Sequence, residues 1–192
     1  MLAPNSTALI LVDVQQAFVQ WEAQGLRRNN PDAVSNIAKL LTAFRARGMP
    51  VFHIRHASTE ADSALRPDRP GFEPIEVARE HPGEAVIVKH VNASFIGTDL
   101  EEQLRDGGIK TLVIAGITTN HCVETTTRMG GNLGFDARLV SDAYYTFDRI
   151  GFDGAPESAE TIHAMTLSNL SGEFATIETT DTVLAALISV AA

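Results

Sequence analysis

Short apolar runs of strand length alternate with helical patterns along the whole chain. The runs cover residues 8–13, 50–55, 84–89, 111–115, 136–141 and 174–178. Many of their residues are Val or Ile, which is typical of strands buried on both faces of a parallel sheet. A clear helix signal lies over residues 30–48, where apolar side chains recur at helical spacing at Val34, Ile37, Leu41 and Phe44. This alternation predicts an α/β fold with a mostly parallel sheet and helices on both of its faces.

The length and composition fit a single domain, expected over residues 1–192, because 44% of the residues are hydrophobic and can fill one core. With 15 basic and 24 acidic residues, the net charge of −9 disfavours nucleic acids and anionic membranes as partners. The apolar stretches fall well short of the ~20 residues that span a bilayer. A lone cysteine suits a reducing compartment and the N-terminus lacks a secretory pattern, so a cytoplasmic location is predicted.

The lone cysteine, Cys122, lies within GITTNHCVETT, directly after the apolar run TLVIAG at residues 111–116. Since a helix can begin after it, the thiol would lie near a helix N-terminus, where free N–H groups and the helix dipole favour an anion. That placement predicts a lowered thiol pKa and a nucleophilic role. The alternative is a small hydrophobic core residue, which is the more common fate of an unpaired cysteine.

Two ionisable residues, Asp13 and Lys89, stand near the carboxyl ends of two other apolar runs. Buried charges are rare without partners, and the carboxyl ends of parallel strands line the crevice where ligands bind in open α/β sheets. Together with Cys122, they would form a reaction centre of an acid, a cation and a thiol. The alternative is three unrelated strand-end residues that face solvent.

With these three residues placed, the chain resembles the isochorismatase-like cysteine hydrolases over nearly its whole length. The resemblance is carried by LVDVQQAF at residues 11–18, by the block from Val86 to Thr126 that contains VIVKH and GITTNHCVETT, and by RLVSDA at residues 138–143. Within the family, residues 141–149 and 158–177 look most like streptothricin hydrolase and its relatives. The resemblance implies a three-layer α/β/α, Rossmann-like fold around a central six-stranded, mostly parallel sheet.

The same resemblance implies an enzyme that cleaves a C–N bond of a small-molecule amide or lactam through a thioester acyl-enzyme. Cys122 would be the nucleophile, Asp13 the base and later the acid for the leaving amine, and Lys89 the cation that holds charge in place. The family commonly has a non-proline cis peptide before the cysteine motif, which would fall at Ile117–Thr118. The backbone N–H groups of Thr118 and Cys122 would then form the oxyanion hole.

Neither a metal nor another cofactor is expected. The nicotinamidase branch of the family binds a metal through an Asp-x-His element and a further histidine, but the corresponding residues 51–59 (VFHIRHAST) contain no aspartate. His53 and His56 are three residues apart, which on a strand places them on opposite faces. Both are therefore predicted to be structural or pocket-lining, and His121 to support the start of the helix or the nucleophile.

Substrate contacts are expected from residues that follow the catalytic strand ends or flank the motifs, namely Phe18, Trp21, Asn92, Phe95, Thr119 and Tyr144. Each aromatic residue among them could equally be core. The long irregular stretch 57–83 is expected to cover the crevice. The resemblance also implies a homodimer or homotetramer, to which the apolar segment 183–192 could contribute, although burial in its own core is an equally simple interpretation.

Two other functions stay open from the sequence. Hydrolysis of the vinyl ether of isochorismate occurs in the family, although true isochorismatases generally lack the nucleophilic cysteine. The other is a catalytically silent, thiol-bearing binding protein, which would have no need of Asp13 or Lys89.

Overall fold

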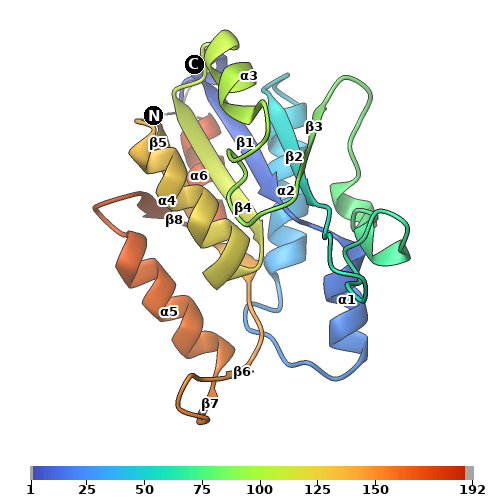
Figure 1. Ribbon diagram of the computed structural model, residues 1–192. Coiled ribbons are helices and arrows are strands. Elements are labelled where there is room, and N and C mark those ends of the chain that lie inside the picture. The colour runs from blue at the N-terminus through green and yellow to red at the C-terminus, as the bar shows by residue number, and fades with distance from the viewer. Residues whose placement is uncertain (1, 189–192) are drawn as a thin grey trace.

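The computed structural model describes residues 2–188, which form a three-layer α/β/α fold around a central sheet (Figure 1). The sheet strands are β1 (Thr7–Val12), β2 (Val51–His56), β3 (Ala85–Lys89), β4 (Thr111–Ile117), β5 (Asp136–Tyr145) and β8 (Thr176–Glu178). Their order is β3-β2-β1-β4-β5-β8, and neighbouring strands pair in parallel. Each predicted apolar run coincides with one of these strands, so the predicted fold class is confirmed.

Helices cover both faces of the sheet, as the near-continuous burial of the central strands β1 and β4 requires. The helices α2 (Ala33–Arg45) and α6 (Thr180–Ile188) pack on the face that carries Leu9 and Leu11 of β1. On the other face, Ala8 and Ile10 contribute to the core that contacts α3 (Leu100–Asp106), α4 (Glu124–Asn132) and α5 (Ala159–Leu170). Successive side chains of β1 thus point alternately into the core on one face of the sheet and into the core on the other.

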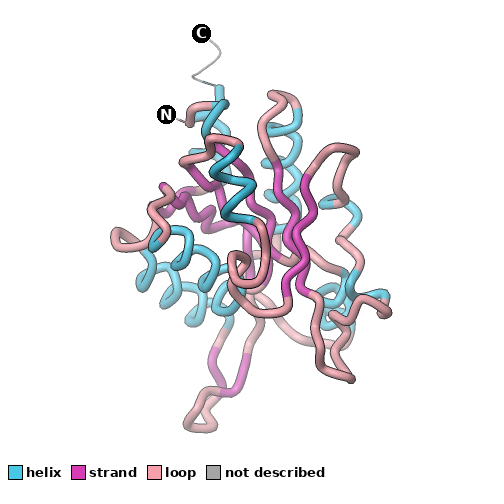
Figure 2. The backbone as a smooth tube through the Cα atoms, turned by 45° about the horizontal axis from the view of Figure 1, so that its top comes forward, coloured by secondary structure: helices cyan, strands magenta, loops and turns pink. Residues whose placement is uncertain are grey.

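The remaining elements precede β1 or lie in the connections between the elements of the sheet and the helices. They are the helix α1 (Gln16–Ala23), the 3₁₀ turns η1 (Pro4–Ser6), η2 (Pro70–Phe72) and η3 (Glu76–Ala78), and the π-helical turn η4 (Thr119–Val123). A short antiparallel hairpin of β6 (Arg149–Ile150) and β7 (Pro156–Glu157) projects from the body of the molecule (Figure 2).

Strand β5 runs four residues beyond the predicted run 136–141. Its pairing with β4 shifts between Ile114, which faces Leu139, and Gly116, which faces Tyr144. Gly116 has φ of +145°, and a Cβ there would overlap the backbone of Val12, so only glycine fits between the strands at this point. Tyr144 therefore lies within strand β5, beyond the end of the predicted run.

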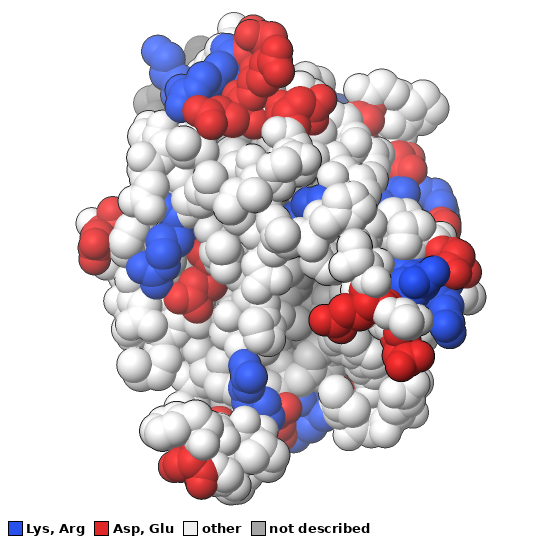
Figure 3. Space-filling model, viewed as in Figure 1, with Lys and Arg blue, Asp and Glu red and all other residues white. Residues whose placement is uncertain are grey.

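The C-terminal segment 183–192 is only partly described. Val183 and Leu187 of α6 are buried in the core shared with α2, so this part of the segment packs within its own chain, whereas residues 189–192 lie outside the described residues. The homo-oligomer stays a prediction. No helix within residues 2–188 is long and apolar enough to cross a membrane. On the face drawn in Figure 3, basic side chains lie beside acidic ones instead of forming a broad basic surface.

Candidate active site

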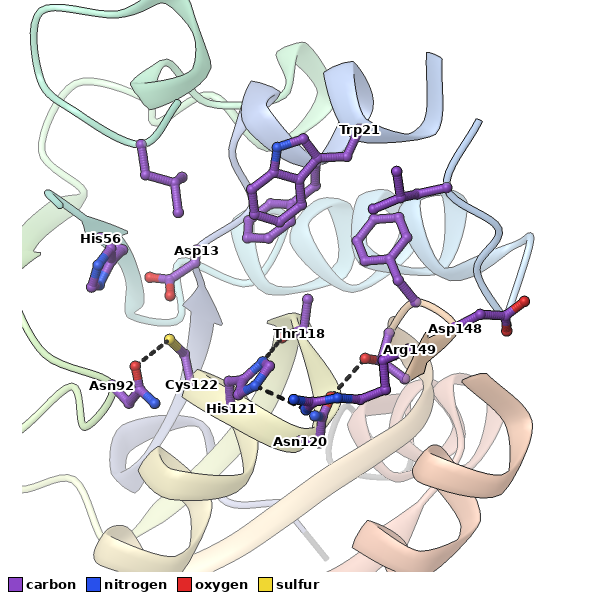
Figure 4. Close-up of a pocket in the computed structure, with 15 residues that line it drawn as sticks. Asp13, Trp21, His56, Asn92, Thr118, Asn120, His121, Cys122, Asp148 and Arg149 are labelled. Carbon is purple, nitrogen blue, oxygen red and sulfur yellow. Dashed lines mark hydrogen bonds between the residues drawn. The ribbon is translucent and has the colours of Figure 1, made fainter. Parts of the chain in front are cut away.

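The carboxyl ends of the central strands open into a pocket of about 360 Å³ (Figure 4). Its polar wall contains Asp13, His56, Asn92, Thr118, Asn120, His121, Cys122, Thr146, Asp148 and Arg149, and its apolar wall contains Phe18, Trp21, Leu26, Leu65 and Phe147. Three of the phenyl and indole rings pack together, with the Phe18 centroid 5.0 Å from that of Trp21 and the Trp21 centroid 6.0 Å from that of Phe147. The pocket is therefore polar on one side and aromatic on the other.

Asp13 directly follows β1, where its φ of 52° lies in the left-handed region that residues with side chains seldom adopt. The side chain is 1% exposed, and its Oδ2 accepts a hydrogen bond from Lys89 Nζ at 2.7 Å. The other oxygen, Oδ1, is buried and has no hydrogen-bond partner among residues 2–188. Leaving a buried carboxylate oxygen without a donor is costly, so Oδ1 is free to accept a hydrogen bond from a group in the pocket.

Lys89 is the last residue of β3, and its side chain is fully buried beneath the pocket. Its Nζ lies 3.3 Å from His56 Nδ1 in addition to its bond with Asp13. An ammonium group only donates, so His56 Nδ1 must be the acceptor. Burial and the positive charge of Lys89 lower the pKa of His56, which keeps this ring neutral.

The side chain of Gln15 holds His56 in place from the end of β1. Gln15 Oε1 accepts from the backbone N–H of His56 at 2.9 Å, and Gln15 Nε2 donates to the His56 carbonyl at 3.2 Å. The same amide donates to the carbonyl of Phe72 at 2.9 Å, which ties the long segment 57–83 to the site. That segment also places Leu65 on the pocket wall, in keeping with the prediction that it covers the crevice.

Cys122 lies in the turn η4, immediately before α4, and its Sγ donates to Asn92 Oδ1 at 3.7 Å. Burial and then the charge of Asp13 raise the pKa of Cys122 to about 12, against the opposing effect of Lys89. The predicted lowering of the thiol pKa is therefore wrong, because loss of solvent and a nearby carboxylate outweigh the helix N-terminus. At neutral pH the group is a thiol, and it needs a base to react.

The peptide bond between Ile117 and Thr118 is cis, as the family resemblance implied. Thr118 lines the pocket. Its Oγ1 lies 3.0 Å from Nδ1 of His121. Thr118 thus lies on the same wall as the thiol, and its part in an oxyanion hole stays a prediction.

The residues predicted to contact substrate divide into two groups. Phe18, Trp21 and Asn92 lie on the pocket wall. The structure places the other three, Phe95, Thr119 and Tyr144, in the core instead.

Each of these three core residues has a packing partner away from the pocket. The Phe95 ring stacks on Phe135 with centroids 6.1 Å apart. Thr119 Oγ1 lies 3.2 Å from His163 Nδ1, and the Tyr144 ring packs on the same imidazole at 4.7 Å. A residue that follows a catalytic strand end can therefore turn into the layer between sheet and helix, which spacing alone does not reveal.

The sequence did not single out four pocket residues that follow β5 or flank the nucleophile, namely Asn120, Thr146, Asp148 and Arg149. Thr146 Oγ1 donates to Asn120 Oδ1 at 2.6 Å, which joins the end of β5 to η4. The signal that could have found them is the carboxyl end of β5. Because the predicted run ended at residue 141, the strand end was placed four residues too early.

Asp13, His56 and Cys122 could supply metal ligands, because one donor atom of each lies within 4.8 Å of the others. The ammonium group of Lys89 is already bonded to Asp13 and contacts His56. A second cation beside it would meet charge repulsion, so this donor set fits a metal poorly. His53 lies elsewhere, with Nε2 2.8 Å from Glu84, so the two histidines of β2 are not co-ligands, as predicted. The expectation that no metal is needed stays a prediction.

Comparison with known proteins agrees with this geometry. The family model described as the isochorismatase domain matches residues 7–182. The chain belongs to the isochorismatase family. It is 46% identical over 179 residues to the uncharacterized isochorismatase family protein YrdC of Bacillus subtilis, covering 92% of this chain and 94% of that protein. It is 32% identical over 185 residues to streptothricin hydrolase of Streptomyces noursei, covering 91% and 69%.

A crystal structure assigned to a hydrolase of the isochorismatase family from Chromobacterium violaceum superimposes with a TM-score of 0.92 at 43% identity, covering 98% of this chain and all of that one. The predicted family and the three-layer fold are thus confirmed. Ureidoacrylate amidohydrolase RutB of Acinetobacter baylyi is 30% identical over 178 residues, covering 75% of this chain and 72% of that protein, and relatives with such names support a hydrolase of the C–N type.

Proposed function

We propose that this hydrolase cleaves an amide or lactam bond of a small molecule through a covalent intermediate on Cys122. The observation that carries the proposal is that the two carboxylate oxygens of Asp13 differ in their hydrogen-bond partners. One carboxylate oxygen accepts from Lys89, and the other has no hydrogen-bond partner among residues 2–188, in the pocket that also holds the thiol. A thiol whose pKa is about 12 requires such an acceptor before it can attack.

In the first step, Asp13 Oδ1 takes the Sγ proton of Cys122 as Sγ forms a bond with the amide carbonyl carbon. The carbonyl π electrons move to its oxygen, and the backbone N–H groups of Thr118 and Cys122 would donate to the resulting oxyanion. One such donor typically contributes about 3–4 kcal/mol of barrier lowering. The ammonium group of Lys89 offsets the negative charge that moves between the thiol and the carboxylate.

In the second step, the C–N bond breaks, and the amine leaves with the proton held on Asp13. Water then attacks the thioester, gives a proton back to Asp13 and releases the acid, while the sulfur of Cys122 regains a proton from the same carboxyl. The sum is amide plus water giving acid plus amine. No redox partner or cofactor enters this balance.

The proposal is tested with a panel of primary amides and lactams and with Cys122→Ala and Cys122→Ser. Both variants should lose amine release by at least about 10³-fold while keeping the unfolding temperature of the parent, since the thiol is the nucleophile. A Cys122→Ala variant that keeps comparable turnover would contradict covalent catalysis and favour the isochorismate-type vinyl-ether reaction. Binding without any turnover by the parent would favour the silent thiol-bearing protein. Dialysis of the parent against a chelator serves as a control. It should leave the rate of amide hydrolysis unchanged, because the ammonium group of Lys89 already lies beside Asp13 and His56, where a metal ion would otherwise bind.

A further inference from the structure

Arg149, the first residue of the β6–β7 hairpin, brings a guanidinium group to the polar wall of the pocket (Figure 4). Its Nη1 lies 3.3 Å from Nε2 of His121. A guanidinium only donates, so Nε2 accepts and the proton of the neutral imidazole is on Nδ1, which donates to Thr118 Oγ1 at 3.0 Å. Burial, followed by the charge of Arg149, lowers the pKa of His121 and favours this neutral ring. The chain of contacts therefore fixes Arg149 beside the residues that follow the cis peptide.

The charges along the pocket wall are paired except for that of Arg149. Asp13 is bonded to Lys89 at 2.7 Å, and Asp148 is bonded to Arg27 at 2.9 Å. Arg149 has no ion pair within the part of the chain that the structure describes. Its single side-chain partner there is an uncharged ring, which uses one of the five N–H donors of a guanidinium.

The carboxylates around the hairpin do not neutralise Arg149. Asp148 accepts from the backbone N–H of Ala159 at 2.8 Å in addition to its ion pair, and Glu160 pairs with Arg27 at 2.7 Å. Glu157 faces Arg149 across the hairpin, yet the two side chains form no ion pair among residues 2–188. A cation held on the wall of a ligand pocket, with donors to spare, is the arrangement that recognises an anionic group.

We propose that Arg149 binds a carboxylate of the substrate, so that the preferred substrates are small amides that carry a carboxylate some bonds away from the scissile carbonyl. This inference rests on the proposed amide hydrolysis. The aromatic wall of Trp21 and Phe147 would hold the apolar part of such a molecule, and the volume of about 360 Å³ restricts it to a compact one. Arg149 is thus a residue that determines specificity, and the bond-breaking steps belong to Asp13, Lys89 and Cys122.

The test compares ω-monoamides of short dicarboxylic acids, such as glutaramate, with their methyl esters, in which the negative charge is removed. Ammonia release reports amide cleavage alone. The parent should favour the carboxylates in kcat/KM by about 10- to 100-fold, the range for charge-assisted hydrogen bonds. Arg149→Gln should abolish this preference through KM, with a loss on the carboxylates about 10- to 100-fold larger than the loss on the esters, whereas Arg149→Lys should retain part of it. Arg105→Gln, which removes an exposed arginine of α3 paired with Glu101, is the matched control and should behave as the parent does.

A binding measurement separates the inference from the proposed reaction. Trp21 is the only tryptophan of the chain and lies on the pocket wall, so its fluorescence reports occupancy. In Cys122→Ala protein, glutarate should bind about 10- to 100-fold more weakly after Arg149→Gln is added. Equal affinity, or an equal loss on charged and uncharged substrates, would overturn the role of Arg149. Amide turnover that survives in Cys122→Ala would overturn the proposed function instead.

Discussion

The two ends of the sheet each hold a carboxylate, a cation and a histidine of β2, but among residues 2–188 only the carboxylate at the carboxyl end has a buried oxygen without a hydrogen-bond partner. At the amino end, Glu84 accepts from Arg45 at 2.7 and 2.8 Å, from His53 at 2.8 Å and from the backbone N–H of His81 at 2.8 Å. Burial by itself would raise the pKa of Glu84, but these donors outweigh it and lower the pKa to about 2. Both oxygens of this carboxylate therefore accept hydrogen bonds.

At the carboxyl end, Asp13 receives one donor, Lys89, and its Oδ1 has no partner among the described residues. The neighbouring thiol of Cys122 has a raised pKa, so a proton acceptor and a proton donor stand together in a pocket. The comparison teaches that residue types alone do not distinguish a structural cluster from a reactive one. The distinction lies in which atoms the fold leaves unpaired.

The largest contrast is expected from removing each carboxylate in turn. Asp13→Asn should lower kcat/KM by about 10²–10⁴-fold, because an amide neither accepts nor returns the proton. Glu84→Gln should leave kcat/KM near that of the parent and lower the unfolding temperature instead. Steady-state kinetics and thermal unfolding of both variants, with circular dichroism to verify folding, decide the matter. A similar loss of activity in the two variants would remove the distinction between the clusters.

A smaller effect concerns acid stability. Since the folded-state pKa of Glu84 is lowered from 4.5 to about 2, its contribution is present above the unfolded pKa and is lost as the pH falls between these values. A shift of this size corresponds to about 3 kcal/mol of unfolding free energy. Chemical unfolding between pH 5 and pH 2 should therefore show a steeper loss in the parent than in Glu84→Gln. Parallel curves for the two proteins would mean that Glu84 is not stabilised as its contacts indicate.

The smallest effect is expected from removing a tyrosine hydroxyl in the core, which tests whether an unpaired polar atom outside the pocket matters for activity. The hydroxyl of Tyr144 is buried without a partner among residues 2–188, whereas that of Tyr145 donates to Glu22 at 3.3 Å. Tyr144→Phe should leave the unfolding free energy unchanged or raise it slightly, while Tyr145→Phe should lower it by about 0.5–1.5 kcal/mol. Activity should not change in Tyr144→Phe. A marked loss of kcat/KM there would show that unpaired polarity matters catalytically outside the pocket as well.

The strands and the placement of Asp13, Lys89 and Cys122 at one edge of the sheet were predictable, because parallel strands have a simple sequence pattern. Buried on both faces, they read as continuous apolar runs, and a charged residue at such a run's end, as at Asp13 and Lys89, stands out. The end of β5 was not predictable in this way. Polar Ser141 and Asp142 interrupt the apolar run, and the strand continues to Tyr145 through an irregular pairing with β4.

The thiol pKa and the pocket lining depend on tertiary contacts that no local pattern encodes. Cys122 has a raised pKa because burial and Asp13, which is distant in sequence, act on it together. Arg149 reaches the pocket only because β5 is long and is followed by a hairpin. Tyr144 and Phe147 lie three residues apart, yet one is core and the other lines the pocket.

The most direct test of covalent catalysis is to trap the acyl-enzyme. The parent protein is mixed with an amide that it hydrolyses, quenched with acid during turnover, and examined by intact-protein and peptide mass spectrometry. The account predicts an added mass equal to the acyl group less one hydrogen, located on Cys122 and absent from Asp13→Asn protein treated in the same way. Turnover of the amide without any adduct on Cys122 under single-turnover conditions, or an adduct on another residue, would contradict it.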